Sequence, residues 1–278
     1  MSTSVVEITP DVRVGDHLPM ALFGGLNVLE SRDLALRVAE TLAAHAARLG
    51  MPYVFKASWD KANRSSHTSF RGPGLDEGLR WLDDVRAQVG VPVLTDLHAP
   101  AQAAAVAQVA ALVQIPAFLV RQTDLIAAAA ATGRPLHLKK MQLMAPAEMA
   151  NVRDKCRALG AEQLILCERG TMFGYHNLVV DPLSFVQLRA LGCPVSFDVT
   201  HSLQQPGGLG ASTAGRGQYV EPLAMAGVSQ GLAALFLEVH PDPARALCDG
   251  PCATPLDRVG SLLERLAALD QHVKSRAL

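Results

Sequence analysis

Residues 51–75 read MPYVFKASWDKANRSSHTSFRGPGL, and they decide the fold because they join an apolar strand to a helix through a long basic loop. The run from Met51 to Phe55 is short and apolar, as in a buried strand, and helical spacing begins at Leu75. In α/β proteins, loops that follow strands carry the chemistry, and cations mixed with hydroxyls suit phosphate or carboxylate groups. A solvated charged loop is the alternative that the pattern alone leaves open. The basic residues of this stretch are Lys56, Lys61, Arg64, His67 and Arg71.

The same alternation of apolar runs and helical stretches continues along the chain. Strands are predicted at Ala21–Val28, Tyr53–Ala57, Pro92–Asp96, Leu112–Ile115, Pro135–Lys139, Gln163–Cys167, Pro194–Asp198 and Ala234–Glu238. Helices are predicted near 32–49, 75–89, 100–109, 121–131, 147–158, 182–191, 219–230 and 256–276. Eight such units in about 250 residues match the size and rhythm of a (β/α)8 TIM barrel. An open doubly wound sheet fits less well, because no Gly-x-Gly-x-x-Gly turn follows the first strand.

We therefore predict one catalytic barrel domain over residues 1–278. Residues 1–20 are predicted to form a short N-terminal β-hairpin that caps the bottom of the barrel, with Gly15-Asp16 between its two apolar runs.

Polar side chains gather where the predicted strands end. Because the active sites of such barrels form at the carboxyl ends of the strands, these side chains should meet on one face. Interior packing alone would favour Val, Ile and Leu there, so the set argues for an anionic substrate with many oxygens. The residues concerned are Asn27, Lys56, Ser58, Asp96, His98, Gln114, Lys139, Lys140, Glu168, Arg169, Asp198, His201, Glu238 and His240.

Composition excludes several other classes. The chain is 49% hydrophobic and 18% charged, as in a globular protein. A net charge of −1 gives no basic field, so nucleic acid is not an expected partner. No apolar stretch reaches the length of a membrane span, and the N-terminus does not read as a secretory signal. Five cysteines without paired zinc spacing fit free thiols in a reducing cytoplasm.

Seven segments, in one consistent order, resemble a known family. KASWDKANRSS (56–66) followed by SFRGPG (69–74) is similar to the substrate loop of the 3-deoxy-D-manno-octulosonate 8-phosphate synthases. The similarity continues through LFGGLNVLESRDLA (22–35), TDLH (95–98), QIPAFLVRQTDL (114–125), CERGTMFGYHNLVVD (167–181), FDVTHSLQ (197–204) and EVHPDPARALCDGP (238–251). These enzymes condense phosphoenolpyruvate with arabinose 5-phosphate for lipopolysaccharide precursor synthesis, and they commonly form homotetramers. Two phosphorylated anions held side by side would repel each other, so several fixed cations are a physical requirement of this reaction.

The resemblance implies a role for each matching residue. Phosphoenolpyruvate would be surrounded by Lys56, Ser58, Lys61, Gln114, Lys139 and Arg169. Arabinose 5-phosphate would be bound by Asn63, Arg64 and Ser65, with Arg64 on its phosphate. Asp96, Phe118 and Glu238 complete the expected substrate pocket, with Glu238 also giving structural support. The expected catalytic residues are Asn27, Lys61, Lys139, His201 and Asp249. Ser58 and Gln114 have a structural alternative, because they could merely satisfy backbone groups.

Position 27 decides whether a metal is expected. One class of this family binds a divalent ion with Cys, His, Glu and Asp, and this chain has His201, Glu238 and Asp249 at three of those positions but Asn27 at the fourth. A neutral carboxamide binds transition metals weakly, so the metal-independent class is implied, without a cofactor. The 204–217 loop (QQPGGLGASTAGRG) resembles the metal-dependent class instead. Cys248 is interpreted as a small buried residue.

The residues leave other functions open, the least expected being a sialic-acid-type synthase, because no appended C-terminal domain follows Leu278. The sister enzyme that uses erythrose 4-phosphate shares the barrel, but it generally carries Lys-Pro-Arg-Thr where this chain has Lys61-Ala62-Asn63-Arg64. The other alternative is a catalytically dead barrel that serves as a binding protein. A comparison of the two sugars tests the sister enzyme, and phosphate release tests the dead barrel.

Overall fold

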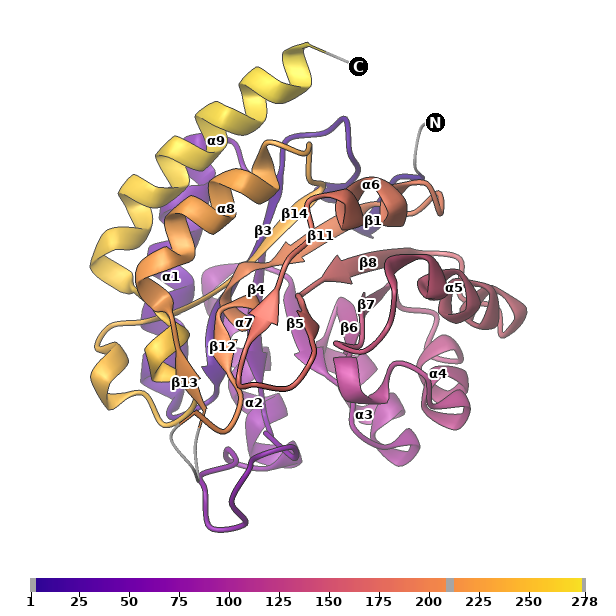
Figure 1. Ribbon diagram of the computed structural model, residues 1–278. Helices are drawn as coiled ribbons and strands as arrows, with labels where there is room; N and C mark the ends of the chain where they lie inside the picture. Colours follow the sequence, from indigo (N-terminus) through magenta and orange to yellow (C-terminus); the bar gives the residue numbers. More distant parts are fainter. Residues whose placement is uncertain (1–3, 209–212, 277–278) are drawn as a thin grey trace.

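The centre of the computed structural model, which describes residues 4–208 and 213–276, is a closed barrel of parallel strands (Figure 1). The strands β3, β4, β5, β6, β7, β8 and β11 pair in this order, and β14 pairs with both β11 and β3 and so closes the barrel. The eight barrel strands are β3 (Ala21–Val28), β4 (Tyr53–Ser58), β5 (Val93–Asp96), β6 (Leu112–Ile115), β7 (Leu136–Lys139), β8 (Leu164–Glu168), β11 (Val195–Asp198) and β14 (Ala234–His240). The predicted TIM barrel is confirmed, and each predicted strand end lies within two residues of the observed one.

Helices cover the outside of this barrel (Figure 1). They are α1 (Arg32–Leu49), α2 (Leu75–Val89), α3 (Ala103–Val109), α4 (Thr123–Ala130), α5 (Met149–Ala158), α6 (Leu183–Arg189), α8 (Val220–Val228) and α9 (Val259–Ser275). Helix α1 shows how the sequence fixes such an element: the Ser31 hydroxyl caps its start by accepting from the Leu34 amide, and Gly50 ends it at φ 64°. The predicted helices at 100–109 and 256–276 each begin with a 3-10 turn, at Pro100–Gln102 and Leu256–Arg258.

The N-terminal hairpin closes the amino end of the barrel. Strands β1 (Val6–Thr9) and β2 (Val12–Val14) pair antiparallel, and their buried side chains pack on residues near the starts of the barrel strands, such as Val54 and Leu112. The predicted position of its turn was wrong: Pro10-Asp11 makes the turn, and Gly15-Asp16 follows β2. Proline presets the backbone angle of a turn, so Pro10 is suited to this position. The first three residues of the predicted 1–20 hairpin lie outside the described residues.

The opposite end of the barrel carries the short elements that surround the site. They are α7 (Val199–Ser202), the β9–β10 hairpin (Thr171–Met172 and Leu178–Val179), the β12–β13 pair (Gln204–Gln205 and Ala214–Gly215) and β15 (Thr254–Pro255). Further 3-10 turns lie at Ala117–Leu119, Pro146–Glu148, Gly217–Tyr219, Pro243–Arg245 and Gly250–Cys252. Positions 209–212 of the predicted 204–217 loop lie outside the described residues.

Glycine at position 25 brings two strands of this end close together. A Cβ on Gly25 would overlap the carbonyl oxygen of Lys56 on the neighbouring β4. Only glycine therefore allows the approach of β3 to β4 that places Asn27 beside Lys56.

Candidate active site

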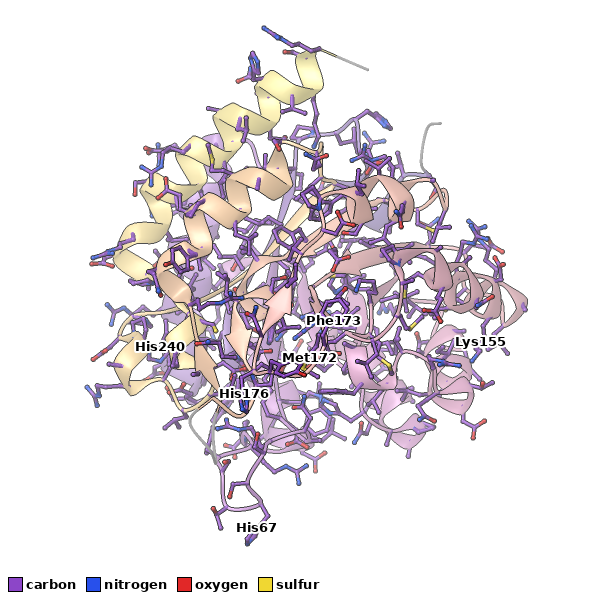
Figure 2. The ribbon with its side chains drawn as sticks, in the orientation of Figure 1. His67, Lys155, Met172, Phe173, His176 and His240 are labelled. Carbon is purple, nitrogen blue, oxygen red and sulfur yellow. The ribbon has the colours of Figure 1, made fainter. Side chains whose placement is uncertain are left out.

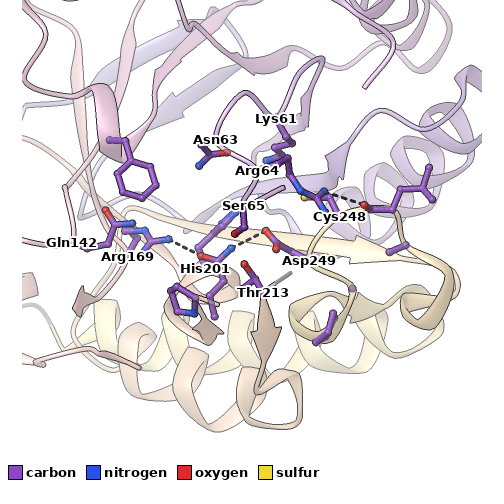
Figure 3. A pocket seen from close by; sticks show the side chains of 17 residues that line it. Lys61, Asn63, Arg64, Ser65, Gln142, Arg169, His201, Thr213, Cys248 and Asp249 are labelled. Atoms are coloured by element: carbon purple, nitrogen blue, oxygen red, sulfur yellow. Dashed lines mark hydrogen bonds between the residues drawn. The ribbon is translucent and has the colours of Figure 1, made fainter. Parts of the chain in front are cut away.

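Two joined compartments open at the carboxyl ends of the barrel strands. The inner compartment has a volume of about 190 Å³ and is lined by ends of β4 to β7, including Lys56, Asp96, Gln114 and Lys139. The outer compartment has a volume of about 390 Å³ and lies between the 61–65 loop and the 246–251 segment (Figure 3). Six residues line both compartments and mark the junction between them: Lys61, Asn63, Phe118, Gln142, Arg169 and His201.

Four cations with buried side chains converge on the inner compartment, namely Lys56, Lys61, Lys139 and Arg169. Burial lowers the pKa of Lys56 and of Arg169, because it disfavours their charged forms. For Lys61, burial is outweighed by Glu238 and Asp96, which raise its pKa. The compartment therefore offers several fixed positive charges out of bulk water, the environment that a small polyanion requires.

Buried acids hold these cations in place. Lys56 Nζ donates to Glu238 Oε1 at 3.0 Å and to Ser58 Oγ at 2.9 Å. Lys139 Nζ pairs with Asp198 and lies 3.8 Å from the centre of the Phe236 ring, a cation–π geometry. Burial alone would raise the pKa of Asp198, but His201 and Lys139 hold that pKa well below the ordinary value. The carboxylates thus stay charged and fix the ammonium groups.

Asp96 ties together the side of the inner compartment formed by β4, β5 and β6. It accepts from Gln114 Nε2 at 2.5 Å and from Ser58 Oγ at 2.6 Å. Burial would raise the pKa of Asp96, yet Lys56 and His98 keep it well below the ordinary value. Ser58 is wholly buried behind Lys56, and within the described part of the chain it lines neither compartment. The geometry gives Ser58 a supporting role, but its partners are the side chains of Lys56 and Asp96 and not the backbone groups that its structural alternative named.

The floor of the site is held together by the amide of Asn27. Asn27 Nδ2 donates to Glu238 Oε2 at 2.7 Å and to Asp249 Oδ2 at 3.0 Å, so its two N–H groups lie between two carboxylates. His201 Nε2 lies 3.6 Å from Glu238 Oε2. Burial would raise the pKa of Glu238, but His201 and Lys56 lower it overall. Over residues 4–208 and 213–276, no group of three or more His, Cys, Asp or Glu side chains has the arrangement of a metal site.

His201 stands between the acids and the two compartments. Its Nδ1 lies 2.7 Å from Asp198 Oδ2, and its backbone amide donates to Asp198 Oδ1 at 2.9 Å. Asp198 is the N-cap of α7, so the sequence FDVTHS fixes Asp198 and His201 at the carboxyl end of β11. His201 lines both compartments, and its role in the site stays a prediction.

The outer compartment carries the loop residues that the sequence singled out. Asn63, Arg64 and Ser65 all line it, and Arg64 Nη1 donates to the carbonyl oxygens of Phe70 and Leu247 at 3.3 and 3.0 Å. Across the compartment, Gln204 Nε2 donates to Asp249 Oδ2 at 2.7 Å while its Oε1 accepts from Arg169 Nη2 at 3.0 Å (Figure 3).

Two basic residues of the 51–75 stretch lie away from the compartments. His67 stands exposed at the far tip of its loop (Figure 2), and Arg71 pairs with Asp60. Neither lines the compartments among the residues that the structure describes. Cys248 lines the outer compartment but is buried, as predicted, and burial raises the pKa of its thiol to about 12. That thiol is therefore a poor nucleophile and a poor metal ligand at neutral pH.

Sequence reasoning missed two site residues, Gln142 and Gln204. Both line the outer compartment, and Gln142 Oε1 is buried without a hydrogen-bond partner among the described residues. A signal was present for Gln142, because it lies three residues past the end of β7, at the end of the barrel where active-site residues gather. A glutamine in a glycine-rich loop gave no comparable signal at position 204.

Comparison with known proteins identifies the class to which this fold and site belong. Residues 3–275 match the DAHP synthetase I family, and the chain belongs to that family. Its relatives are enzymes named 2-dehydro-3-deoxyphosphooctonate aldolase, another name for the synthase that the sequence resembles. The relative from Azotobacter vinelandii is 59% identical over 264 residues, which cover 95% of this chain and 94% of the relative. That from Hahella chejuensis is 56% identical over 274 residues, covering 99% and 97%. That from Acinetobacter baylyi is 54% identical over 264 residues, covering 95% and 93%.

These relatives confirm the predicted family and an enzymatic function. Their names do not distinguish the metal-dependent from the metal-independent class. Within the described ranges, no helix combines the length and the apolar character needed to cross a bilayer.

Proposed function

We propose that this chain, acting as one catalytic barrel domain, condenses phosphoenolpyruvate with D-arabinose 5-phosphate and water. The products are 3-deoxy-D-manno-octulosonate 8-phosphate and inorganic phosphate, and the role is in lipopolysaccharide precursor synthesis. The observation that carries this proposal is the pair of joined compartments, a small inner one with four buried cations and a larger outer one with the Asn63-Arg64-Ser65 loop. The names of the close relatives support the same reaction.

The volumes and charges of the compartments support one substrate in each. Phosphoenolpyruvate is small and carries a carboxylate and a phosphate, so it suits the inner compartment with Lys56, Lys139 and Arg169. Arabinose 5-phosphate is longer and suits the outer compartment, where the guanidinium of Arg64 is available for its phosphate. Its aldehyde would then point to the junction, where Lys61 lines both compartments.

The reaction then proceeds between two anions held end to end. C3 of phosphoenolpyruvate forms a carbon–carbon bond to the aldehyde carbon, whose oxygen takes a proton. Water adds at C2 and gives up one proton, and the resulting hemiketal phosphate loses inorganic phosphate by cleavage of the C–O bond. The Lys61 ammonium at the junction is suited to stabilise the developing alkoxide, and His201 and Asp249 are suited to orient the water.

The floor of the site supports a reaction without a metal ion. In a metal site, a cation would neutralise Glu238, Asp249 and the ligand at position 27. In this chain, the two N–H groups of Asn27 instead donate to both carboxylates, at 2.7 and 3.0 Å. The Asn27 N–H groups thus occupy the place between the two acids that a cation would take, and the neutral amide oxygen is a weak ligand for a transition metal. Asn27 therefore supports the metal-independent class, although the 204–217 loop resembles the other class.

We also propose a cytoplasmic homotetramer. Five free and buried thiols fit a reducing compartment. Several large apolar side chains are exposed around the β9–β10 hairpin and α6, among them Phe173, Tyr175, Leu183 and Val186, and Figure 2 shows Phe173 near the mouth of the barrel. Such side chains favour self-association. Light scattering after gel filtration tests this proposal, and a monomeric mass at micromolar concentration would contradict it.

A comparison of two sugars tests the proposed reaction. Phosphate release from phosphoenolpyruvate should require arabinose 5-phosphate, and erythrose 4-phosphate should support it at least about 100-fold less well, since the shorter sugar cannot span the outer compartment to Arg64. Equal release with both sugars would contradict the substrate assignment. Absence of release with either sugar would indicate a barrel that only binds ligands.

A further inference from the structure

His137 is a wholly buried histidine in the middle of β7, where barrel interiors usually hold branched apolar side chains. Its ring contacts Phe23 edge-on at 5.4 Å and stacks on Phe236 at 6.1 Å. Burial, followed by the charge of Lys139, lowers the pKa of His137 to about 3. The ring is therefore neutral at pH 7 and carries a single N–H, so it needs one acceptor and one donor.

Both ring nitrogens have a partner. Nδ1 lies 2.9 Å from Gln114 Oε1, and Nε2 lies 2.8 Å from Ser196 Oγ. The direction of each hydrogen bond follows from Asp96, because a carboxylate can only accept. Since Gln114 Nε2 donates to Asp96 Oδ1 at 2.5 Å, Gln114 Oε1 must face the histidine. Nδ1 of His137 therefore carries the proton and donates to Gln114, and Nε2 accepts from the hydroxyl of Ser196.

This hydrogen-bond chain continues to a cation of the inner compartment. Asp96 Oδ2 accepts from Ser58 Oγ at 2.6 Å, and Ser58 Oγ in turn accepts from Lys56 Nζ at 2.9 Å. If the Gln114 amide were rotated by half a turn, its carbonyl oxygen would face the Asp96 carboxylate and would also line the compartment that receives an anion. Both contacts would be repulsive. With the amide held as observed, one N–H of Gln114 remains for a ligand.

We propose that His137 is a positioning residue for the inner compartment: it holds the Gln114 carboxamide, and through Asp96 and Ser58 the ammonium of Lys56, in the orientation that binds an anion. This inference rests on the proposed function, which places phosphoenolpyruvate in that compartment. His137 lines neither compartment among the described residues, so it acts through Gln114 rather than on the substrate.

Two substitutions separate the hydrogen bond from the packing of the ring. His137→Phe keeps an aromatic ring between Phe23 and Phe236 but removes the donor, whereas His137→Asn keeps a donor at the place of Nδ1 but removes the ring. We expect His137→Phe to raise the KM for phosphoenolpyruvate about 10- to 100-fold, because it leaves a buried acceptor unsatisfied. His137→Asn should stay within about threefold of the unmodified enzyme, although its melting temperature falls. The KM for arabinose 5-phosphate should change little in either variant.

A purely structural role would give the opposite pattern. If the KM for phosphoenolpyruvate follows the loss of thermal stability rather than the loss of the donor, the proposal is overturned. A double-mutant cycle adds a second test, since His137→Phe should have almost no further effect on this KM in a Gln114→Ala background. Additive effects of the two substitutions would show that His137 does not act through Gln114.

Two further measurements keep the outcomes distinct. If His137→Phe does not fold, Ser196→Ala replaces it: loss of the Nε2 partner should raise the same KM about 3- to 10-fold, and an unchanged KM would overturn the proposal. Phosphate release by the unmodified enzyme is measured first. Absence of release there overturns the proposed function together with this inference, whereas normal release with the wrong variant pattern overturns only the role of His137.

Discussion

Replacing Lys139 by Met removes one ammonium from the inner compartment while keeping the approximate length of the side chain. Lys139 pairs with Asp198, which is wholly buried. Removing one partner of a buried ion pair costs about 3–5 kcal/mol, because a charge is left without compensation. At about 2–4 °C per kcal/mol for a large domain, the variant should melt roughly 6–20 °C below the unmodified protein. It should still fold, since His201 remains within 2.7 Å of Asp198.

Turnover should fall by more than the lost stability explains. We expect the folded Lys139→Met variant to retain less than about 1% of the rate of phosphate release, because a buried cation that faces a developing charge is worth several kcal/mol. The double variant Lys139→Met/Asp198→Asn removes both charges, so its melting temperature should recover most of the way to that of the unmodified protein. Its activity should not return. Calorimetry and steady-state kinetics on the two variants decide the matter: recovery of activity together with stability would show that Lys139 serves only the fold.

Three further substitutions test other parts of the account. Arg64→Ala should raise the KM for arabinose 5-phosphate about 30- to 1000-fold and leave that for phosphoenolpyruvate nearly unchanged, with Arg71→Ala on the same loop as the control; equal losses for both substrates would contradict the assignment. The lowered pKa of Asp96 makes the folded state more stable. This stabilisation is complete above the ordinary aspartate pKa of about 3.9 and is lost as the pH falls below that value. Asp96→Asn should therefore flatten the decline of urea stability below about pH 4, and an equally steep decline would refute this. Asn27→Cys should acquire a metal ion and become sensitive to chelators, because a thiolate adds charge and a soft donor; a variant that stays metal-free in elemental analysis after incubation with zinc would count against the reasoning.

The barrel was predictable because each strand is a short apolar run with a polar residue at or near its carboxyl end. Buried parallel strands need apolar side chains on both faces, and this pattern placed β3 and β6 at the observed residues. The hairpin turn was misplaced because Gly-Asp and Pro-Asp are both acceptable turn pairs. Only the packing of β1 and β2 against the barrel strands selects between them.

Membership of the site was predictable in the same way, but the partners of each side chain were not. The sequence placed Asn27, Lys56 and Glu238 at three strand ends, yet it could not show that the Asn27 amide donates to both Glu238 and Asp249. It also gave no sign that Ser58 donates to Asp96 or that His137 lies within hydrogen-bond distance of Gln114. These facts depend on side-chain rotation inside the barrel, which the strand pattern does not determine.

Phosphate release after removal of metal ions tests the central claim most directly. The unmodified enzyme is treated with EDTA or dipicolinate, its metal content is measured, and release is followed with phosphoenolpyruvate and arabinose 5-phosphate. With Asn27 donating to Glu238 and Asp249, the rate should be unchanged by chelation, and added manganese or zinc should not stimulate it. Loss of activity on chelation with recovery on addition of metal would contradict the account, and the 204–217 loop would then have been the better guide to the class.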